Sequence, residues 1–252
     1  MLTCVVVPHF DHVQQFKELL PRLSAQGLPL VVVDDASPEE SYRVLQRLLD
    51  EHTEGSILVR HAKNLGKGGA VMTGLRAALD AGYTHALQID ADGQHDVADM
   101  VRFRDASQEY PDRIVCGQPV FDQSISKLRY YARYITLCLS WVESLSTEIR
   151  DALCGFRVYP LDPVVTLFEK SNPGKRMAFD PEILVRAVWA GIGLKFIPVK
   201  VQYPEGGRSH FLYVRDNIEI SWMHTRLIVG MLLRLPALIR RNRSRQEGPV
   251  TR

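Results

Sequence analysis

The sequence predicts an α/β fold with a mostly parallel sheet that helices cover on both faces. Three observations support this prediction. Short apolar, β-rich runs alternate with helical segments through the first half of the chain, which is typical of parallel strands joined by helices. Polar residues follow the runs at the point where each strand would end. The 252 residues, of which 46% are hydrophobic, also suffice for one sizeable core.

Each expected element follows from a local pattern. The apolar runs place strands at residues 3–7, 30–33, 56–59, 86–89, 114–116 and 194–201. The intervening segments place helices at residues 13–24, 38–50, 69–81 and 97–109. The second of these helices carries its own start signal, because Ser37 is a good N-cap and Pro38 suits the first turn. Glu39 and Glu40 then lie beside the positive end of the helix dipole.

The polar residues after the strands gather at one edge of this sheet. They are Pro8 and His9, Asp34 and Asp35, Lys63 and Asn64, and Asp90 and Asp92. Ligands of open α/β sheets bind beyond the carboxyl ends of the strands. The alternative is a set of ordinary capping residues and turns, but four consecutive strands with polar ends favour a ligand site.

The run from Ile89 to His95 is the most informative part of this edge. Asp90 and Asp92 follow a buried strand and point the same way if the extended backbone persists. Hard carboxylate oxygens, with an amide oxygen from Gln94, suit Mg²⁺ or Mn²⁺ that holds a diphosphate. By itself, the Asp-x-Asp pattern fits a solvated turn equally well.

A helix is expected after residue 118, with an apolar stripe through Leu128, Tyr131, Ile135, Leu139 and Val142. Arg129 and Arg133 are four residues apart, so they share a helix face, which we expect opposite the stripe. One interpretation is a solvated basic face. The other is a site for an anionic acceptor, because the guanidinium fork suits phosphate.

Six segments together resemble family 2 glycosyltransferases of the GT-A fold. The resemblance covers about residues 3–210, and its nearest branch is that of the dolichol- and polyprenyl-phosphate sugar transferases. The segments that carry it are Val5-Val6-Val7-Pro8, residues 32–37 (VVDDAS), residues 63–70 (KNLGKGGA), residues 90–95 (DADGQH), residues 151–157 (DALCGFR) and residues 179–182 (FDPE). The order and spacing of these segments make the resemblance specific.

The resemblance implies a role for each residue of the donor site. Asp35 would accept from the nucleobase with Asp34 alongside, Pro8 would shape the backbone there, and Lys63 would lie near the nucleotide. Gly66 leads into a helix whose free N–H groups suit phosphate, although an ordinary tight loop explains the glycines too. Asp90 would reach the ribose or sugar, and Asp92 and Gln94 would complete the metal site with it.

The resemblance also implies acceptor-side residues. Asp151 would lie beside the sugar, and Arg129 and Arg133 near a lipid phosphate. Asp180 would act as a general base if the acceptor is a hydroxyl, whereas a phosphate needs no base. Asp180 also fits a plain helix N-terminal acid, and Asp-Pro-Glu replaces the usual Glu-Asp of the family here. Arg208 belongs to a glycine-rich loop, 203–210, that would close over the diphosphate.

The last 42 residues are expected to form a helical, basic tail. Its apolar side chains extend to Leu232, and seven arginines but only one acid follow from Arg226 onward. We therefore expect a catalytic domain at 1–210 and a membrane-facing tail at 211–252, with the alternative that the helix packs on the domain. No run is judged long enough to span a bilayer. The net charge of +2 gives no reason to expect nucleic acid. We expect a cytoplasmic protein, peripheral at the inner face of the membrane.

The combined prediction is an inverting glycosyltransferase that depends on Mg²⁺ or Mn²⁺. It would move a sugar from a UDP- or GDP-linked donor to a lipid-linked or lipid-like acceptor, such as a polyprenyl phosphate. Two alternatives remain open at this point. One is a nucleotidyltransferase, and the other is a non-catalytic membrane module with a nucleotide pocket.

Overall fold

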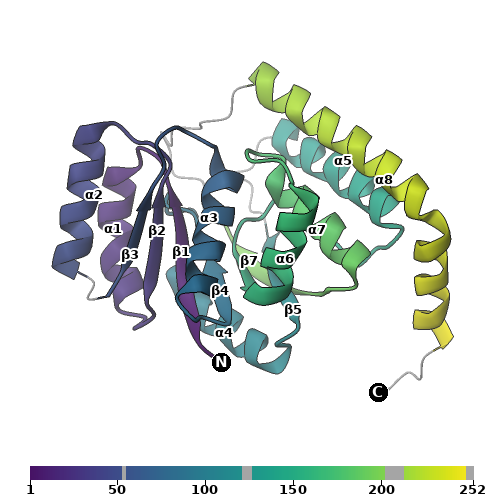
Figure 1. The fold of residues 1–252 in the computed structure, drawn as a ribbon, viewed down its shortest axis with the longest axis horizontal. Helices are drawn as coiled ribbons and strands as arrows, with labels where there is room; N and C mark the ends of the chain where they lie inside the picture. The colour runs from purple at the N-terminus through teal and green to yellow at the C-terminus, as the bar shows by residue number, and fades with distance from the viewer. Residues whose placement is uncertain (53–54, 121–126, 202–212, 248–252) are drawn as a thin grey trace.

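A single seven-stranded sheet forms the centre of the protein, which we describe from a computed structural model (Figure 1). The structure describes residues 1–52, 55–120, 127–201 and 213–247. The strands are β1 (Thr3–His9), β2 (Leu30–Asp34), β3 (Ile57–Arg60), β4 (His85–Gln88), β5 (Arg113–Val120), β6 (Arg157–Pro160) and β7 (Gly193–Lys200), in the spatial order β3-β2-β1-β4-β6-β5-β7. β6 is antiparallel to both of its neighbours, and the other pairs are parallel. The predicted mostly parallel sheet is therefore confirmed.

Helices cover both faces of this sheet. They are α1 (Val13–Ser24), α2 (Glu39–His52), α3 (Lys67–Asp80), α4 (Met100–Glu109), α5 (Lys127–Ser144), α6 (Leu161–Ser171), α7 (Phe179–Ala190) and α8 (Tyr213–Glu247). One core lies under α1, α2 and α4, where Phe16, Leu45 and Phe103 are fully buried. The second core lies under α3, α6 and α7, where Leu75 and Ile183 are fully buried. The predicted helix at 97–109 begins with a 3-10 turn, Val97–Asp99.

Two elements of the second half were not expected. β6 is a short strand that contains a charged residue, Arg157, and ends in Pro160, so its sequence lacks a clear strand pattern. α6 follows it directly and packs on α3. β6 inserts between β4 and β5 and places residues 151–157 beside the Asp-x-Asp run.

Three side chains of the predicted apolar stripe of α5 face solvent, although a solvated basic face opposite the stripe would have required the stripe to be buried. Tyr131, Ile135 and Val142 are 64%, 63% and 51% exposed. The buried face of α5 carries Thr136, Ser140 and Ser144, whose hydroxyl groups donate to carbonyl oxygens of the same helix. The expected orientation was wrong because these hydroxyls satisfy their own hydrogen bonds, so small polar residues pack inside at little cost.

α8 lies along α5 at the side of the molecule away from β3 (Figure 1). Its inner face buries Met223, Leu227, Met231 and Leu238. Residues 214–243 form a helix long enough to span a membrane, and its most apolar 18-residue window has a mean hydropathy of 1.2, with only 28% of that window buried. The prediction that no run is long enough to span a bilayer was therefore wrong about the length of this helix. Length and composition alone do not separate a span from a helix that packs on a domain.

Several arginines of the basic tail have partners inside the protein. Arg226 pairs with buried Glu182 of α7 at 3.1 Å. Arg241 donates to the carbonyl oxygens of Val188 and Ser144, at 2.5 and 3.0 Å, near the ends of α7 and α5. The C-terminal half of α8 therefore donates to carbonyl groups at the ends of α7 and α5, where the Val188 carbonyl also accepts the N–H of Gly191.

We predict that Arg241→Ala destabilises the protein by about 1–3 kcal/mol, because two carbonyl oxygens lose a charged donor. Arg240→Ala is the matched control, since the Arg240 side chain is exposed and, among the described residues, bonds only to Pro236 of its own helix. Its effect should stay within about 0.5 kcal/mol. Urea unfolding measures the free energy of unfolding of both variants. Equal effects of the two variants would show that Arg241 does not hold the helix ends.

Candidate functional site

The carboxyl ends of β2 and β3 surround a buried carboxylate, that of Asp35. Its two oxygens accept the backbone N–H groups of Leu65 and Gly66, both at 2.7 Å. The ring of His61 lies 2.7 Å from the same carboxylate. Asp35 thus organises the loop that leads into α3, a role that the sequence did not indicate. Its predicted contact with a nucleobase stays a prediction.

An open pocket of about 490 Å³ lies beside Asp35. The residues that line it come from the ends of β2 and β3 and are Ala36, Ser37, Arg60, His61 and Ala62. His61 both lines this pocket and contacts the carboxylate of Asp35. Lys63 is exposed nearby in sequence, and Pro8 is half-buried at the end of β1.

Asp34 is buried and is held by neighbours on three segments. His9 lies 3.3 Å away, the backbone N–H of Ser37 donates at 3.3 Å, and Arg60 lies at 3.4 Å. Burial opposes ionisation of Asp34, but the hydrogen bonds from His9 and Ser37 outweigh it, so its pKa is lowered. Asp34 therefore joins β1, β2 and β3 at the edge where the site lies.

The glycines at the start of α3 allow a close approach of two helices. A Cβ at Gly68 would lie 2.3 Å from the Cβ of Phe179, at the first residue of α7. Gly66 has a φ of +91°, and the N–H of Gly69 donates to the carbonyl oxygen of Lys175 at 2.7 Å. Packing therefore requires these glycines, and two of their N–H groups already have partners inside the protein. Phosphate binding by Gly66 stays a prediction.

Asp90 and Asp92 lie together beyond the end of β4, in different environments. The carboxylate of Asp90 contacts the ammonium of Lys67 at 2.8 Å and the amide of Gln88 at 3.4 Å. Burial opposes its ionisation, but the charge of Lys67 outweighs burial and lowers the pKa of Asp90. Asp92 accepts the backbone N–H of Gln94 at 3.1 Å. Burial and the charge of Asp90 raise the pKa of Asp92 to about 6.

These carboxylates fit a divalent cation held jointly with a ligand. Asp92 is poorly neutralised, as its raised pKa shows, and a cation would relieve its repulsion with Asp90. Within the described parts of the chain, no three His, Cys, Asp or Glu side chains converge on one point. Mg²⁺ is commonly bound by one or two carboxylates together with phosphates of the substrate. Gln94 follows in the same turn, and its role as a ligand stays a prediction.

Lys67 links the Asp-x-Asp pair to Asp180, the second residue of α7. The Lys67 ammonium lies 2.8 Å from Asp90 and 3.0 Å from Asp180. Burial would lower the pKa of Lys67, but the two carboxylates outweigh it and raise the pKa above its usual value. Asp180 is thus more than an acid at a helix start, because its side chain joins the donor side of the site.

A buried polar chain closes the other side of this arrangement. Arg157 is fully buried and donates to the carbonyl oxygen of Asp180 at 3.0 Å and to the hydroxyl of Tyr159 at 3.4 Å. Tyr159 donates to Gln88 at 3.1 Å, and Gln88 donates to Asp90. Together with Lys67, these residues form a closed ring between β4, β6, α3 and α7. We call this set the polar ring.

Asp151 and Arg133 pair with each other. The Arg133 guanidinium binds both carboxylate oxygens of Asp151, one of them at 2.6 Å. Asp151 also accepts the N–H groups of Leu153 and Cys154. One of the two interpretations placed Arg133 on a solvated face, but only 15% of its side chain is exposed. The helix is rotated relative to that expectation, and Arg133 points toward the residues that precede β6.

The side chains of two predicted acceptor-side arginines are not among those that the structure describes. Arg208, with the loop predicted at 203–210, lies outside the described residues, and so does the side chain of Arg129. The chain just before that loop is placed, because Val201 pairs with His95 next to the Asp-x-Asp run. The roles assigned to Arg129 and Arg208 stay predictions.

The sequence indicated no role for four members of the polar ring, Lys67, Gln88, Arg157 and Tyr159. Lys67 and Arg157 stood inside the quoted motifs. A buried charged residue such as Arg157 needs a partner, but its burial could not be foreseen because β6 lacks a clear strand pattern. No sequence signal indicates that Lys67 contacts Asp180, since 113 residues separate them and only the α3–α7 contact joins them.

The fold and this edge of the sheet define a glycosyltransferase of the GT-A type. The sequence pattern described as "Glycosyl transferase family 2" matches residues 4–170. Because that match covers more than half of the chain, the protein belongs to glycosyl transferase family 2. Membership of this family decides against the nucleotidyltransferase alternative.

Two curated relatives match most of the chain. A UDP-N-acetylglucosamine–dolichyl-phosphate N-acetylglucosaminyltransferase of Methanococcus voltae is 24% identical over 250 residues, which cover 92% of this chain and 98% of the relative. An undecaprenyl-phosphate mannosyltransferase of Micrococcus luteus is 25% identical over 221 residues, which cover 83% of this chain and 87% of the relative.

A solved structure confirms the GT-A architecture. Glucosyl-3-phosphoglycerate synthase from Mycobacterium tuberculosis, in complex with Mn²⁺, UDP and glucosyl-3-phosphoglycerate, matches with a TM-score of 0.63. The match covers 92% of this chain and 79% of that chain at 15% identity. At this identity the likeness concerns the fold alone.

We predict that Mn²⁺ binding weakens as the pH falls below about 6. The raised pKa of Asp92 means that this carboxylate is ionised above about pH 6 and protonated below it, where the cation must displace a proton. The loss should approach tenfold per pH unit below about pH 6. Calorimetric titration of Mn²⁺ between pH 5 and 8, in roughly half-unit steps, measures it.

Asp92→Asn is the control for this prediction, because it removes the titrating group with little change of shape. This variant should bind Mn²⁺ weakly at every pH and show no inflection near pH 6. A wild-type affinity that stays constant from pH 7 to 5 would contradict the assignment of Asp92.

Proposed function

We propose that this protein transfers a sugar from a nucleoside-diphosphate donor to a lipid-linked acceptor, with a polyprenyl phosphate as the preferred acceptor. The observation that carries the proposal is the Asp90–Asp92 pair beside the polar ring, in a chain of glycosyl transferase family 2. The names of both curated relatives, which act on dolichyl and undecaprenyl phosphates, support the acceptor class.

The donor would lie along the edge from β3 to β4. The pocket lined by Ser37, Arg60 and His61 would take the base of UDP or GDP, and Asp90 would face the ribose or sugar. Asp92, with Asp90 and Gln94, would hold Mg²⁺ or Mn²⁺. The bound cation would neutralise the negative charge that develops on the diphosphate leaving group.

Transfer would proceed by a single displacement with inversion of the anomeric centre. The acceptor oxygen attacks as the bond to the diphosphate breaks, so no covalent sugar–enzyme intermediate forms. The described residues contribute by holding the reactants in place, which is a large part of catalysis for a displacement of this kind. A phosphate acceptor is already anionic and needs no general base, whereas a hydroxyl would require one, for which Asp180 is the candidate.

The acceptor phosphate would approach from the side of α5. Arg133 is held there by Asp151 and keeps a small exposed fraction of its side chain. A guanidinium that is already oriented by a carboxylate loses less side-chain entropy when it binds an anion. Asp151 then has two uses, as the partner of Arg133 and as a group near the transferred sugar.

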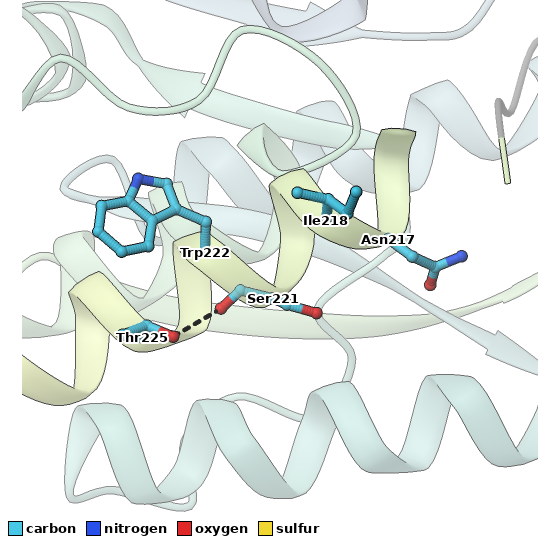
Figure 2. Close-up of a pocket in the computed structure, with 5 residues that line it drawn as sticks. All are labelled: Asn217, Ile218, Ser221, Trp222 and Thr225. Atoms are coloured by element: carbon cyan, nitrogen blue, oxygen red, sulfur yellow. Dashed lines mark hydrogen bonds between the residues drawn. The ribbon is translucent and has the colours of Figure 1, made fainter. Parts of the chain in front are cut away.

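The lipid part of the acceptor fits the apolar surface of α5 and α8. In the described residues, twelve of the sixteen exposed large hydrophobic side chains belong to these two helices. Ile218 and Trp222 of α8 lie beside an open hollow of about 410 Å³, whose lining also includes Asn217, Ser221 and Thr225 (Figure 2). Apolar surface gathered on one side of a protein marks a membrane or partner interface. We propose peripheral binding at the inner, cytoplasmic face of the membrane.

We predict that the protein transfers sugar to undecaprenyl phosphate in detergent with Mn²⁺. The donor would be a UDP- or GDP-linked sugar, such as UDP-N-acetylglucosamine or GDP-mannose. With this acceptor, Arg133→Ala should raise the acceptor KM about tenfold or more, because one charged hydrogen bond to phosphate is lost. Asp180→Asn should change turnover little. A fall of about 10²–10⁴-fold in kcat for Asp180→Asn would show instead that a hydroxyl is deprotonated.

Arg133→Ala also leaves Asp151 without its guanidinium, so thermal unfolding of each variant must accompany the kinetics. Arg133→Lys is the control for this loss, because it keeps a positive charge beside Asp151. If the wild-type protein transfers no sugar from any of these donors to any polyprenyl phosphate, the acceptor class is wrong.

We predict that the protein sediments with anionic vesicles of phosphatidylglycerol and phosphatidylcholine, less at high salt and little with neutral lipid. Replacing Trp222 and Leu233, which are 62% and 78% exposed, by Gln should weaken capture at least about tenfold, because each inserts apolar area into lipid. Val101→Gln on α4 is the control, since Val101 is 41% exposed but lies on another helix. Equal capture of all variants would exclude α8 as the contact.

A further inference from the structure

Lys67 is the centre of the polar ring, because its ammonium neutralises two carboxylates at once. It lies 2.8 Å from Asp90 Oδ2 and 3.0 Å from Asp180 Oδ2. Asp90 belongs to the donor side of the site, and Asp180 to the start of α7. The lysine itself is the first residue of α3. A single side chain thus sets the relative positions of three elements.

Asp180 depends on Lys67 more than Asp90 does. In the described part of the chain, Asp180 Oδ1 is buried without a hydrogen-bond partner, and the nearest guanidinium nitrogen, on Arg157, lies 3.8 Å away. The other oxygen contacts Lys67. Asp90 has a second donor, the amide of Gln88. Removal of the ammonium would therefore leave Asp180 as a buried carboxylate with no close hydrogen-bond donor, which is strongly unfavourable.

The fold reserves space for this contact. A Cβ at Gly155 would lie 2.6 Å from Lys67 Nζ and 2.9 Å from Asp90 Oδ2. No other residue type would leave the ammonium and the carboxylate where they are. Gly155 stands just before β6, whose Arg157 supports Asp180 from the opposite side. Separate parts of the chain therefore converge on the same ion cluster.

We propose that Lys67 is a positioning residue for sugar transfer and that it acts through Asp180. Its ammonium fixes the Asp180 carboxylate beside the donor site and cancels the negative charge that would otherwise repel the diphosphate. This inference rests on the proposed function for its kinetic part. The reason is electrostatic, because uncompensated carboxylates near a diphosphate oppose its binding and move apart from each other.

A double-mutant cycle tests whether Lys67 acts through Asp180. The variants are Lys67→Met, Asp180→Asn and the double variant, with Lys67→Arg as the conservative change. Lys17→Met is the control, because Lys17 is an exposed lysine of α1. Turnover is measured with the nucleotide sugar that the wild type uses and undecaprenyl phosphate.

We expect Lys67→Met to lower kcat about 10²-fold, the effect of a small misplacement of site groups. The double variant should match Asp180→Asn within about threefold, whichever acceptor is used, because the carboxylate that needed Lys67 is neutral in both. Lys67→Arg should recover about tenfold of the loss, since it keeps the charge. Losses that multiply in the double variant, or Lys67→Met with kcat within about twofold of wild type, would overturn the proposal.

Mn²⁺ titration without donor or acceptor gives a readout that does not need transfer. Lys67→Met should bind Mn²⁺ about tenfold more tightly, because the cation no longer competes with an ammonium at Asp90. Lys17→Met should bind it as the wild type does. Unchanged Mn²⁺ affinity in Lys67→Met would also overturn the proposal. If Lys67→Met does not fold, the double variant, in which the repulsion is relieved, carries the same measurement.

The two proposals fail in different ways. Tighter Mn²⁺ binding by Lys67→Met in a protein that transfers no sugar would uphold the link between Lys67 and the donor carboxylate and reject the proposed function. Transfer by the wild type, with multiplying losses in the cycle, would uphold the function and reject the role of Lys67.

Discussion

Charge compensation of buried carboxylates is the constraint on which this site depends. The strand ends and the start of α7 bury several acids, and an unpaired buried charge is too unfavourable to persist. Each acid has therefore acquired a partner from another element. Asp35 accepts backbone N–H groups, and Asp151 pairs with Arg133. Asp90 and Asp180 both contact the ammonium of Lys67. The positions of the loops follow from these pairs.

The same pairs hold the side chains of the proposed site in place before any ligand binds. Groups that would contact a nucleotide or sugar are already oriented by partners within the protein, so less side-chain freedom is lost on binding. Close packing supports this order. Gly68 lets α3 approach Phe179 of α7, and Gly155 leaves room for the Lys67–Asp90 contact. Asp92 is the exception, because its charge is poorly compensated and a cation would complete its environment.

α5 and α8 have one side that packs inside the protein and another side that is exposed. Their facing sides hold the domain together through buried residues such as Met223 and Leu227, and through the contact of His224 with Glu143 at 2.6 Å. Their outer sides expose aromatic and aliphatic residues. A water-facing helix normally shows the reverse pattern. The arrangement fits a protein whose proposed acceptor is carried in a lipid layer.

The sequence by itself predicted the parallel strands of the sheet and the Asp90–Asp92 pair after β4, because apolar runs that end in polar residues are local patterns. It did not predict β6, whose four residues lack a clear strand pattern. It determined neither the orientation of α5 nor the partners of the acids. Serine and threonine hydroxyls that bond within their own helix reversed the expected buried face of α5. Lys67 contacts Asp180 because α3 packs on α7. That contact joins segments far apart in the sequence, so no local pattern predicts it.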